Sequence, residues 1–193
     1  MTKIIGLTGG IGSGKTTIAN HFKKANIPVY IADDEARKIM QSEEIIDAIR
    51  KTFGDAIFDN TILNREKLSK IVFENPEKLK LLNAIIHPAV KKDFQNWVLN
   101  HKNAPFIIYE AAILFESGSY KNCDLIISVT APIESRIQRV IQRDNTSREQ
   151  VLKRINTQWD DDQRIAKSDF VIENVNPKTT KIEIEKILKI LKI

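Results

Sequence analysis

The most constraining feature of this sequence is a crowd of glycines close to its first residue. Five of the seven glycines in the chain fall between residues 6 and 14. Glycine loses more conformational freedom on folding than any other residue, so such crowding indicates unusual backbone angles or a close approach to another group. The apolar run KIIGL precedes most of these glycines at residues 3–7, and a helical pattern follows from Thr16 to about Ala25. The chain therefore places a glycine-rich turn between a buried strand and a helix.

The same stretch, GGIGSGKT at residues 9–16, matches the pattern G-x-x-x-x-G-K-[ST] in full. A loop that wraps a phosphate must aim several backbone N–H groups at one point, and the following helix adds its unpaired N–H groups and positive dipole end. The spacing predicts that Lys15 contacts the β- and γ-phosphates of a nucleoside triphosphate and that the Thr16 hydroxyl ligates Mg²⁺. The residues expected to bind the nucleotide here are Gly10, Ile11, Gly12, Ser13, Gly14, Lys15, Thr16 and Thr17.

Short apolar runs alternate with helical patterns along much of the chain. Further strands are predicted at residues 28–31, 106–109, 125–129 and 170–172. This alternation is typical of a parallel sheet that helices cover on both faces. We therefore expect an α/β fold of the P-loop NTPase type, with a parallel sheet of about five strands.

The stretch from about residue 35 to residue 102 is helical in character and interrupts this alternation. Asn75-Pro76 predicts a helix start, with Asn as the N-cap and Pro in the first turn, and His87-Pro88 predicts a second start. We expect the stretch to be an insertion between two strands of the sheet. The expected division is a nucleotide-binding core at residues 1–34 and 105–193 and a helical insertion at residues 35–104.

Two helix signals stand out in the C-terminal third. Thr146-Ser147-Arg148-Glu149 fits a capping box, which predicts a helix start. At the end of the chain, apolar residues recur at i, i+3, i+4 and i+7 and give one apolar helix face, which we expect to pack on the sheet. These residues are Ile184, Ile187, Leu188 and Leu191.

Composition limits the location and the class of partner. The single cysteine, Cys123, cannot form an internal disulfide, and no apolar run is long enough for a signal peptide core or a membrane span, so we expect a cytoplasmic protein without a membrane partner. The formal net charge is +5, which suits a phosphate-rich ligand or nucleic acid. No aromatic residues interleave with the basic ones, which counts against nucleic acid.

Arginines cluster where a kinase would need mobile positive charge. Six of the nine arginines lie between Arg136 and Arg164. Arg136, Arg139 and Arg143 share one helical face, and such a face favours a phosphate ligand because the guanidinium fork matches phosphate oxygens. The alternative is a solvated face on which these arginines pair with nearby carboxylates, namely Glu134, Asp144 and Glu149.

Asp33 is the candidate for the group that positions and deprotonates an acceptor hydroxyl. It follows the second predicted strand, and in open α/β sheets ligands bind at the carboxyl ends of strands. The alternative is that Asp33 or Asp34 caps the next helix. Arg37 lies four residues after Asp33 and would either meet an acceptor phosphate or pair with Asp33.

Several motifs together resemble those of the dephospho-coenzyme A kinase family, nearly from end to end. The glycine-rich stretch LTGGIGSGKTT is similar to the family's loop, and ADDEAR at residues 32–37 resembles its D-A-D-x-x-A-R, with Ile31 in place of the first aspartate. LNAIIHP at residues 82–88 and ILFE at residues 113–116 also match, with Ala112 where proline is usual. The remaining matches are Arg139…Arg143-Asp144, Arg154-Ile155 with Gln158, and DFVIEN at residues 169–174, without the usual glycine after Asn174.

This resemblance implies a specific reaction. ATP, with Mg²⁺, would phosphorylate the ribose 3′-hydroxyl of dephospho-coenzyme A to give coenzyme A and ADP. The implied catalytic residues are Asp33, Lys15 and Arg139. The helical insertion at residues 35–104 would bind the acceptor, and Arg37 and His87 would contact it together with Asp33. Arg143 and Asn174 would bind the nucleotide. Residues from about 136 to 160 would form a lid, and no obligate protein partner or nucleic acid is implied.

Two other functions compete with this one. A kinase of another small hydroxyl compound or nucleoside would carry the same phosphate loop. A basic ATPase stimulated by nucleic acid is the third candidate, and it predicts binding that weakens steeply with salt. A GTPase is disfavoured because neither N-K-x-D nor D-x-x-G occurs in the chain.

Overall fold

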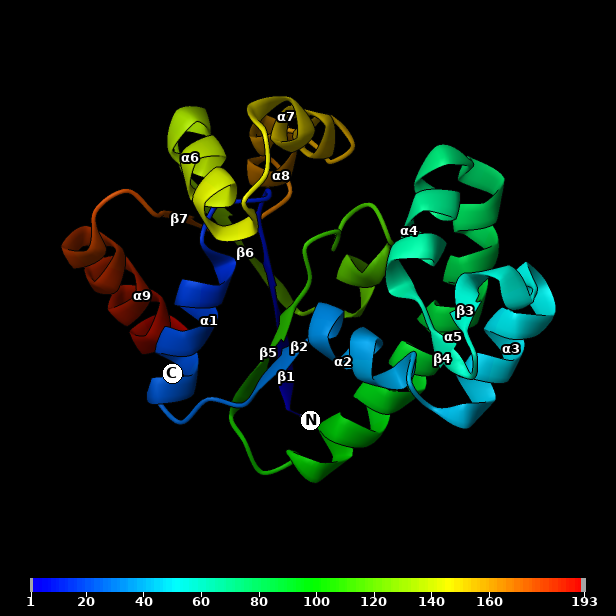
Figure 1. Cartoon of the computed structure of the whole chain (residues 1–193). Helices are drawn as coiled ribbons and strands as arrows, with labels where there is room; N and C mark the ends of the chain where they lie inside the picture. The colour runs from blue at the N-terminus through cyan, green and yellow to red at the C-terminus, as the bar shows by residue number, and fades with distance from the viewer. Residues whose placement is uncertain (1, 192–193) are drawn as a thin grey trace. The chain divides into compact units, whose positions relative to one another are not determined.

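The computed structural model describes residues 2–191, which fall into two compact units. The first unit contains the residues up to Ile31 and those from His101 onward, and the second contains Ala32–Asn100 (Figure 1). The second unit is therefore inserted between two segments of the first. Among residues 2–191, no helix combines the length and the apolar character that a transmembrane span needs.

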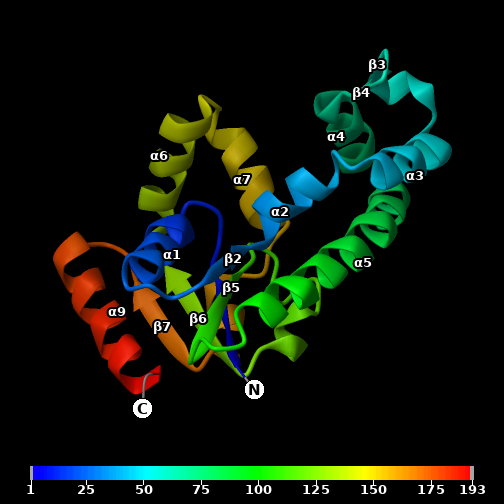
Figure 2. The same ribbon diagram turned by 90° about the horizontal axis from the view of Figure 1, so that it is seen from below.

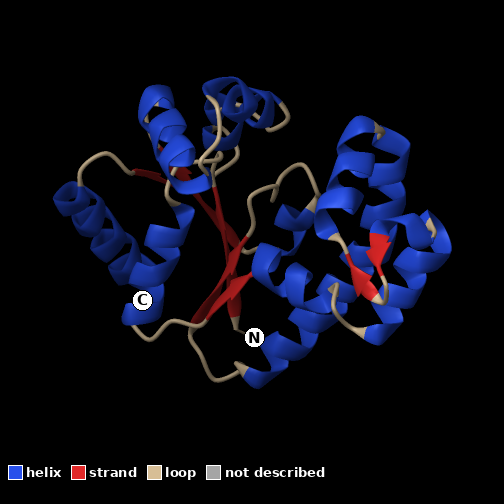
Figure 3. Ribbon diagram, in the orientation of Figure 1, coloured by secondary structure: helices blue, strands red, loops and turns tan. Residues whose placement is uncertain are grey.

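A five-stranded parallel sheet forms the centre of the first unit (Figure 3). Its strands lie in the order β2-β5-β1-β6-β7, so β1, which leads into the glycine-rich loop, is the middle strand. The strands are β1 (Lys3–Thr8), β2 (Val29–Ile31), β5 (Phe106–Glu110), β6 (Leu125–Thr130) and β7 (Phe170–Glu173). All five were predicted from the sequence, and the predicted fold class is confirmed.

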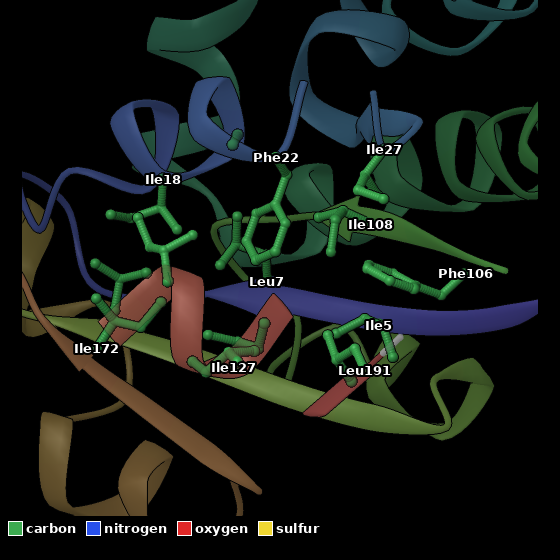
Figure 4. Close-up of a cluster of buried hydrophobic side chains, with 14 residues drawn as sticks. Ile5, Leu7, Ile18, Phe22, Ile27, Phe106, Ile108, Ile127, Ile172 and Leu191 are labelled. Carbon is green, nitrogen blue, oxygen red and sulfur yellow. The ribbon is translucent and has the colours of Figure 1, made fainter. Parts of the chain in front are cut away.

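Helices α1 and α9 cover one face of this sheet, and Figures 1 and 2 show them on the same side. α1 (Lys15–Lys24) turns Ile18, Ala19 and Phe22 toward the strands, and α9 (Pro177–Leu191) buries its expected apolar stripe. The buried side chains interdigitate in one cluster (Figure 4). Each fully buried aliphatic or aromatic side chain in it contributes roughly 1.5–3 kcal/mol of hydrophobic free energy.

The opposite face of the sheet lies against the segment that links β5 to β6. A Cβ added to Gly6 of β1 would lie 2.8 Å from Cδ2 of Leu114 and 3.0 Å from Sγ of Cys123, so the segment packs directly on the strand. This segment ends in the short 3₁₀ helix η2 (Ser119–Asn122). The remaining helices of the unit are α6 (Ile133–Asp144), α7 (Arg148–Asn156) and α8 (Asp161–Ile165).

The second unit is mostly helical, as predicted, with α2, α3 and α4 packed on the long helix α5. Its elements are α2 (Ala32–Ile39), α3 (Glu43–Phe53), the 3₁₀ helix η1 (Asp55–Ile57), a hairpin of β3 (Phe58–Asp59) and β4 (Ile62–Leu63), α4 (Arg65–Glu74) and α5 (Pro76–Asn100). The side chain of Asn75 accepts hydrogen bonds from the N–H groups of Glu77 and Lys78, so the predicted cap at the start of α5 is confirmed.

Of two further predicted helix starts, the one at His87-Pro88 is wrong, and the one at residues 146–149 is confirmed with its cap moved by one residue. His87-Pro88 starts no helix, because Pro88 lies inside α5. Proline has no backbone N–H, so the helix forgoes one hydrogen bond at this position and continues on both sides of it. The cap of α7 is Ser147, not Thr146: the Ser147 hydroxyl accepts from the N–H of Gln150, which shifts the start of the helix by one residue.

Candidate active site

The glycine-rich loop ends in a helix whose first N–H groups have no side-chain cap. α1 begins at Lys15, and its N-cap, Gly14, has φ of +95°, a left-handed conformation that L side chains rarely adopt. No side chain caps this end of α1. The N–H groups at this helix start and the positive dipole end therefore make an anion-binding site.

Close packing, and not only phosphate binding, explains the glycine at position 12. A Cβ on Gly12 would lie 2.5 Å from the main-chain oxygen of Arg136 and 3.0 Å from its Cα. Gly12 also has φ of +78°. The loop therefore lies directly against the backbone of α6, where no side chain fits.

The polar side chains of the loop differ in burial. Nζ of Lys15 donates a hydrogen bond to the main-chain oxygen of Gly9 at 2.8 Å, so the ammonium group lies over the loop itself. Thr16 and Thr17 are exposed in the first turn of α1. The hydroxyl of Ser13 is buried and makes no hydrogen bond within the described part of the chain, which marks it as a group that a ligand or water would satisfy.

Asn174 and Arg139 hold the loop from the side of β7 and α6. Nη1 of Arg139 donates to the main-chain oxygens of Gly12 and Ser13 at 3.3 and 3.4 Å, and Nη2 donates to that of Asn174 at 2.9 Å. Nδ2 of Asn174 donates to the oxygen of Ser13 at 2.8 Å. The structure thus brings two of the predicted site residues onto the loop, where both bind main-chain oxygens.

Arg136 belongs to a buried charge network beside the loop. Its side chain is only 6% exposed, and its Nη1 lies 3.0 Å from Oδ2 of Asp161. Arg164, 1% exposed, contacts the other oxygen of Asp161 at 3.0 Å and Glu116 at 3.7 Å. Burial lowers the pKa of the Arg136 guanidinium, and the Asp161 carboxylate opposes that shift and keeps the group charged.

The outer arginines are paired with carboxylates. Asp144 accepts hydrogen bonds from Arg143 at 2.7 Å and from Arg154 at 2.8 Å, and these two partners lower the pKa of the Asp144 carboxyl. Arg148 makes a bidentate pair with Glu134. The arginines of α6 therefore do not act as one face: Arg136 and Arg139 hold the loop, while Arg143 is 63% exposed beside Asp144.

A cavity of about 310 Å³ lies between the start of α6 and the segment joining α7 to α8. Arg136 and Asp161 of the buried network form part of its wall. The other lining residues are Ile133, Ile155, Asn156, Gln158, Trp159 and Asp160. Its wall is thus shared with the groups that hold the glycine-rich loop.

The predicted acceptor residues lie in the second unit. Asp33 is exposed in the first turn of α2, two residues after β2 ends, and no hydrogen bond or ion pair engages its carboxylate among the described residues. Arg37 pairs with Asp34 at 2.7 Å, and not with Asp33. His87 is exposed on α5, and the protein atoms around its imidazole exclude enough water to lower its pKa.

β1 and β2, the strand that precedes Asp33 in the sequence, end at the same edge of the sheet. In the sheet register, both Ile31 at the end of β2 and Leu7 of β1 pair with Glu110, the last residue of β5. The chain therefore leaves β2 toward Asp33 at the same edge of the sheet at which β1 leads into the loop. Glu110 is 4% exposed at this edge.

A dedicated metal cage is absent from the described residues. Among them, no group of three or more His, Cys, Asp or Glu side chains is placed to hold a metal ion. The exposed Thr16 hydroxyl is the donor that the loop itself offers. This set fits Mg²⁺, which keeps several waters and binds through one or two protein groups together with substrate phosphates.

Sequence reasoning missed several residues that build this site. The pairing of Arg136 with Asp161 and of Arg164 with Glu116 joins segments far apart in the chain, and no periodicity indicates these two contacts, whereas Asp161 and Arg164 themselves are a local i, i+3 pair. α8 was also missed, although its capping box, Asp160 with Gln163, is a signal that can be read from the sequence.

Comparison with known proteins gives one consistent family. The family model described as dephospho-CoA kinase matches residues 3–179. A dephospho-CoA kinase of Fusobacterium nucleatum is 44% identical over 172 residues, which are 89% of each chain. Among solved structures, TT1252 from Thermus thermophilus has a TM-score of 0.91 at 32% identity, covering 98% of this chain and 97% of that one. Dephospho-CoA kinase from Campylobacter jejuni has a TM-score of 0.71 at 27% identity, covering 100% and 98%.

Proposed function

This chain belongs to the dephospho-CoA kinase family, and from that membership we infer that it is an ATP-dependent kinase that phosphorylates dephospho-CoA in coenzyme A biosynthesis. We further propose that the acceptor is the ribose 3′-hydroxyl. The observation that carries the kinase function is the start of α1, which has no side-chain cap and follows a complete phosphate loop. A site that transfers phosphate must first hold a polyphosphate.

The nucleotide would bind over the loop. The N–H groups from Gly12 to Thr17 would surround the phosphates, and the ammonium group of Lys15 would leave the oxygen of Gly9 for the β- and γ-phosphates. Thr16 would hold Mg²⁺, which supplies charge neutralisation between the β- and γ-phosphates. The buried Ser13 hydroxyl supports this proposal, since it makes no hydrogen bond within the described residues.

Asp33 would orient the acceptor hydroxyl and accept its proton. Its carboxylate is exposed and makes no hydrogen bond or ion pair among the described residues, so it is available to a substrate. Phosphoryl transfer has a loose transition state, in which placing the hydroxyl contributes more than deprotonating it early. Arg37 and His87 would contact the acceptor, Arg37 as the cation and His87 as a neutral ring.

The outer part of residues 136–160, beyond the side chains of Arg136, Arg139 and Gln158 that hold the loop, would act as a lid over the transferred phosphoryl group. Arg143 supports this role, because its side chain is 63% exposed and its bond to Asp144 lies at the surface, where an ion pair is worth little. Asn174 would bind the nucleotide, and Arg139 would place its charge beside the phosphates while it holds the loop. Closure of the lid would exclude water, the competing acceptor. A cytoplasmic location stays a prediction from composition.

The test is ADP release with ATP and Mg²⁺, measured with dephospho-CoA and in parallel with nucleosides, shikimate and single-stranded DNA. We expect dephospho-CoA alone to drive turnover and the product to carry a 3′-phosphate. Omitting Mg²⁺ should abolish turnover. Stimulation by shikimate, a nucleoside or DNA in place of dephospho-CoA would contradict the proposal.

A further inference from the structure

The peptide groups of Ile11 in the phosphate loop are both bound by side chains from distant segments. The N–H of Ile11 donates to Oε1 of Gln158 at 2.9 Å. Its carbonyl oxygen accepts from Nε of Arg136 at 3.0 Å. Gln158 lies between α7 and α8, so the loop is held at one residue from two sides.

Arg136 is fixed by its surroundings. It is buried and its guanidinium also donates to Asp161, whose other oxygen accepts from Arg164. Moving Arg136 away from Asp161 would leave a buried charge unpaired, which is strongly destabilising. The carbonyl of Ile11 therefore meets a donor whose position is set by α8.

Gln158 is fixed in a similar way. The N–H of Gln158 donates to the oxygen of Ile155 at 3.1 Å, and the N–H of Trp159 donates to Oε1 of Glu116 at 2.9 Å. The Trp159 ring stacks on Phe115, with ring centres 5.3 Å apart and planes 4° from parallel. The acceptor that Gln158 offers to Ile11 is therefore pre-positioned.

From these contacts we propose that Gln158 and Arg136 are positioning residues for phosphoryl transfer, which act through the two peptide groups that flank Ile11. Gln158 binds the N–H of the Gly10–Ile11 peptide and Arg136 binds the carbonyl of the Ile11–Gly12 peptide, so turning either peptide group breaks a hydrogen bond, and the N–H groups that follow in the loop keep their direction toward the phosphates. Ile11 thereby anchors the loop and leaves phosphate binding to its neighbours. This role rests on the proposed kinase function, although the contacts that define it do not.

The test compares three variants in the full chain. Gln158→Met keeps the length of the side chain but removes the acceptor, Gln158→Glu keeps an acceptor oxygen, and Lys186→Met also replaces a long polar side chain by methionine, on the exposed side of α9. Amide hydrogen exchange is measured at Ile11, and kcat and KM are measured with ATP and dephospho-CoA.

We expect Gln158→Met to speed exchange at Ile11 at least about 5-fold and to lower kcat about 3- to 10-fold, the equivalent of one neutral hydrogen bond, with KM for dephospho-CoA within about twofold. Exchange should stay slow in Gln158→Glu, and Lys186→Met should match the original chain. Unchanged exchange in Gln158→Met, or a change in the KM for dephospho-CoA without one in kcat, would overturn the proposal.

The test also covers a variant that does not fold and a chain that does not phosphorylate dephospho-CoA. If Gln158→Met does not fold, Gln158→Asn, which is one methylene too short to reach Ile11, takes its place with the same expected results. If the original chain does not phosphorylate dephospho-CoA, the proposed function fails, whereas the exchange of Ile11 and the affinity for MgATP still test the role of Gln158.

Discussion

Asn174 donates a hydrogen bond from its side chain to the main-chain oxygen of Ser13 at 2.8 Å, across 161 positions of sequence. The N–H of Asn174 donates in turn to the oxygen of Thr130, the last residue of β6. The turn after β7 is thereby fixed to the sheet and to the phosphate loop at once. The geometry of the loop depends on residues at both ends of the chain.

A first prediction follows at Gly14. Its Cβ in Gly14→Ala would lie 2.0 Å from Nδ2 of Asn174, in a backbone with φ of +95°. We expect the affinity for ATP to fall at least about 10-fold, because the side chain of Asn174 must leave Ser13 and the left-handed conformation costs about 1–2 kcal/mol for an L residue. Isothermal titration with MgATP measures this. Gly118→Ala is the control, since it has a similar φ of +75° but no atom within 4 Å of its Cβ; equal losses in both variants would rule out the contact with Asn174.

A second prediction concerns Lys15. Replacing it by alanine removes the ammonium group proposed for the β- and γ-phosphates, and we expect kcat to fall about 10³-fold, as for the loss of a main electrostatic contact to the transition state. Steady-state kinetics with dephospho-CoA measure the effect. Lys23→Ala removes an exposed lysine from the last turn of the same helix and should keep full activity. A normal kcat in Lys15→Ala would contradict the phosphate-binding role.

A third prediction concerns Asp33. We expect Asp33→Asn to lower kcat about 10²–10⁴-fold with little change in the KM for ATP, because the amide neither accepts the proton nor orients the hydroxyl in the same way. The matched change Glu35→Gln, in the same turn of α2, breaks only the pair with Lys38 and should have little effect. Turnover near that of the original chain in Asp33→Asn would remove Asp33 from the mechanism.

A fourth prediction concerns stability. Asp161→Asn takes the shared carboxylate from Arg136 and Arg164, whose side chains are 6% and 1% exposed, so the buried Arg136 loses its charge partner while Arg164 keeps Glu116 at 3.7 Å. We expect the free energy of unfolding to drop by about 3–5 kcal/mol, measured by urea denaturation. Glu149→Gln breaks an exposed pair with Lys153 and should change it by less than about 1 kcal/mol. Equal effects of the two changes would show that burial of the network is unimportant.

A fifth prediction concerns Cys123. Burial raises the pKa of its thiol to about 12, so at pH 8 only about 10⁻⁴ of the thiol is ionised, against about a quarter in an unfolded chain. We expect a thiol reagent to label the folded protein at least about 10³-fold more slowly than the urea-unfolded chain. Because the pKa is higher in the folded state, the thiol's contribution to stability is complete below the unfolded pKa and is lost as pH rises toward about 12. Fast labelling of the folded chain at pH 8 would contradict the burial of this thiol, and the single cysteine makes the signal unambiguous.

The sheet could be predicted because each strand carries its own signal. Runs such as FIIY and LIISV are mostly apolar, as expected for strands buried on both faces, and the observed bounds of each strand differ from the predicted ones by one residue. The hairpin of β3 and β4 was missed because strands of two residues have no measurable alternation. The helix start at His87-Pro88 was wrongly predicted because proline occurs in the first turn of a helix and also inside a helix that forgoes one hydrogen bond, and the sequence does not distinguish the two positions.

The site was predictable only where it is local. The phosphate loop is one continuous stretch, and its spacing alone indicates a helix start that binds anions. Arg136 was grouped with Arg139 and Arg143 by helical spacing, but burial separates them, because its partner Asp161 lies 25 positions away in a helix that the sequence did not predict. Gln158 appeared only as part of a family motif, and its contact with Ile11 follows from the fold.

The position of β1 in the middle of the sheet affects how the protein emerges from the ribosome. Its partners in register begin at Phe106 and Leu125, so the strand that leads into the phosphate loop is made well before either strand with which it pairs. At about 5–20 residues per second, roughly 5–20 s of synthesis separate Lys3 from Phe106. During that time residues 32–100 emerge, and their contacts are mostly with one another. The inserted unit is therefore free to fold on the nascent chain while the nucleotide-binding unit still lacks strands β5, β6 and β7.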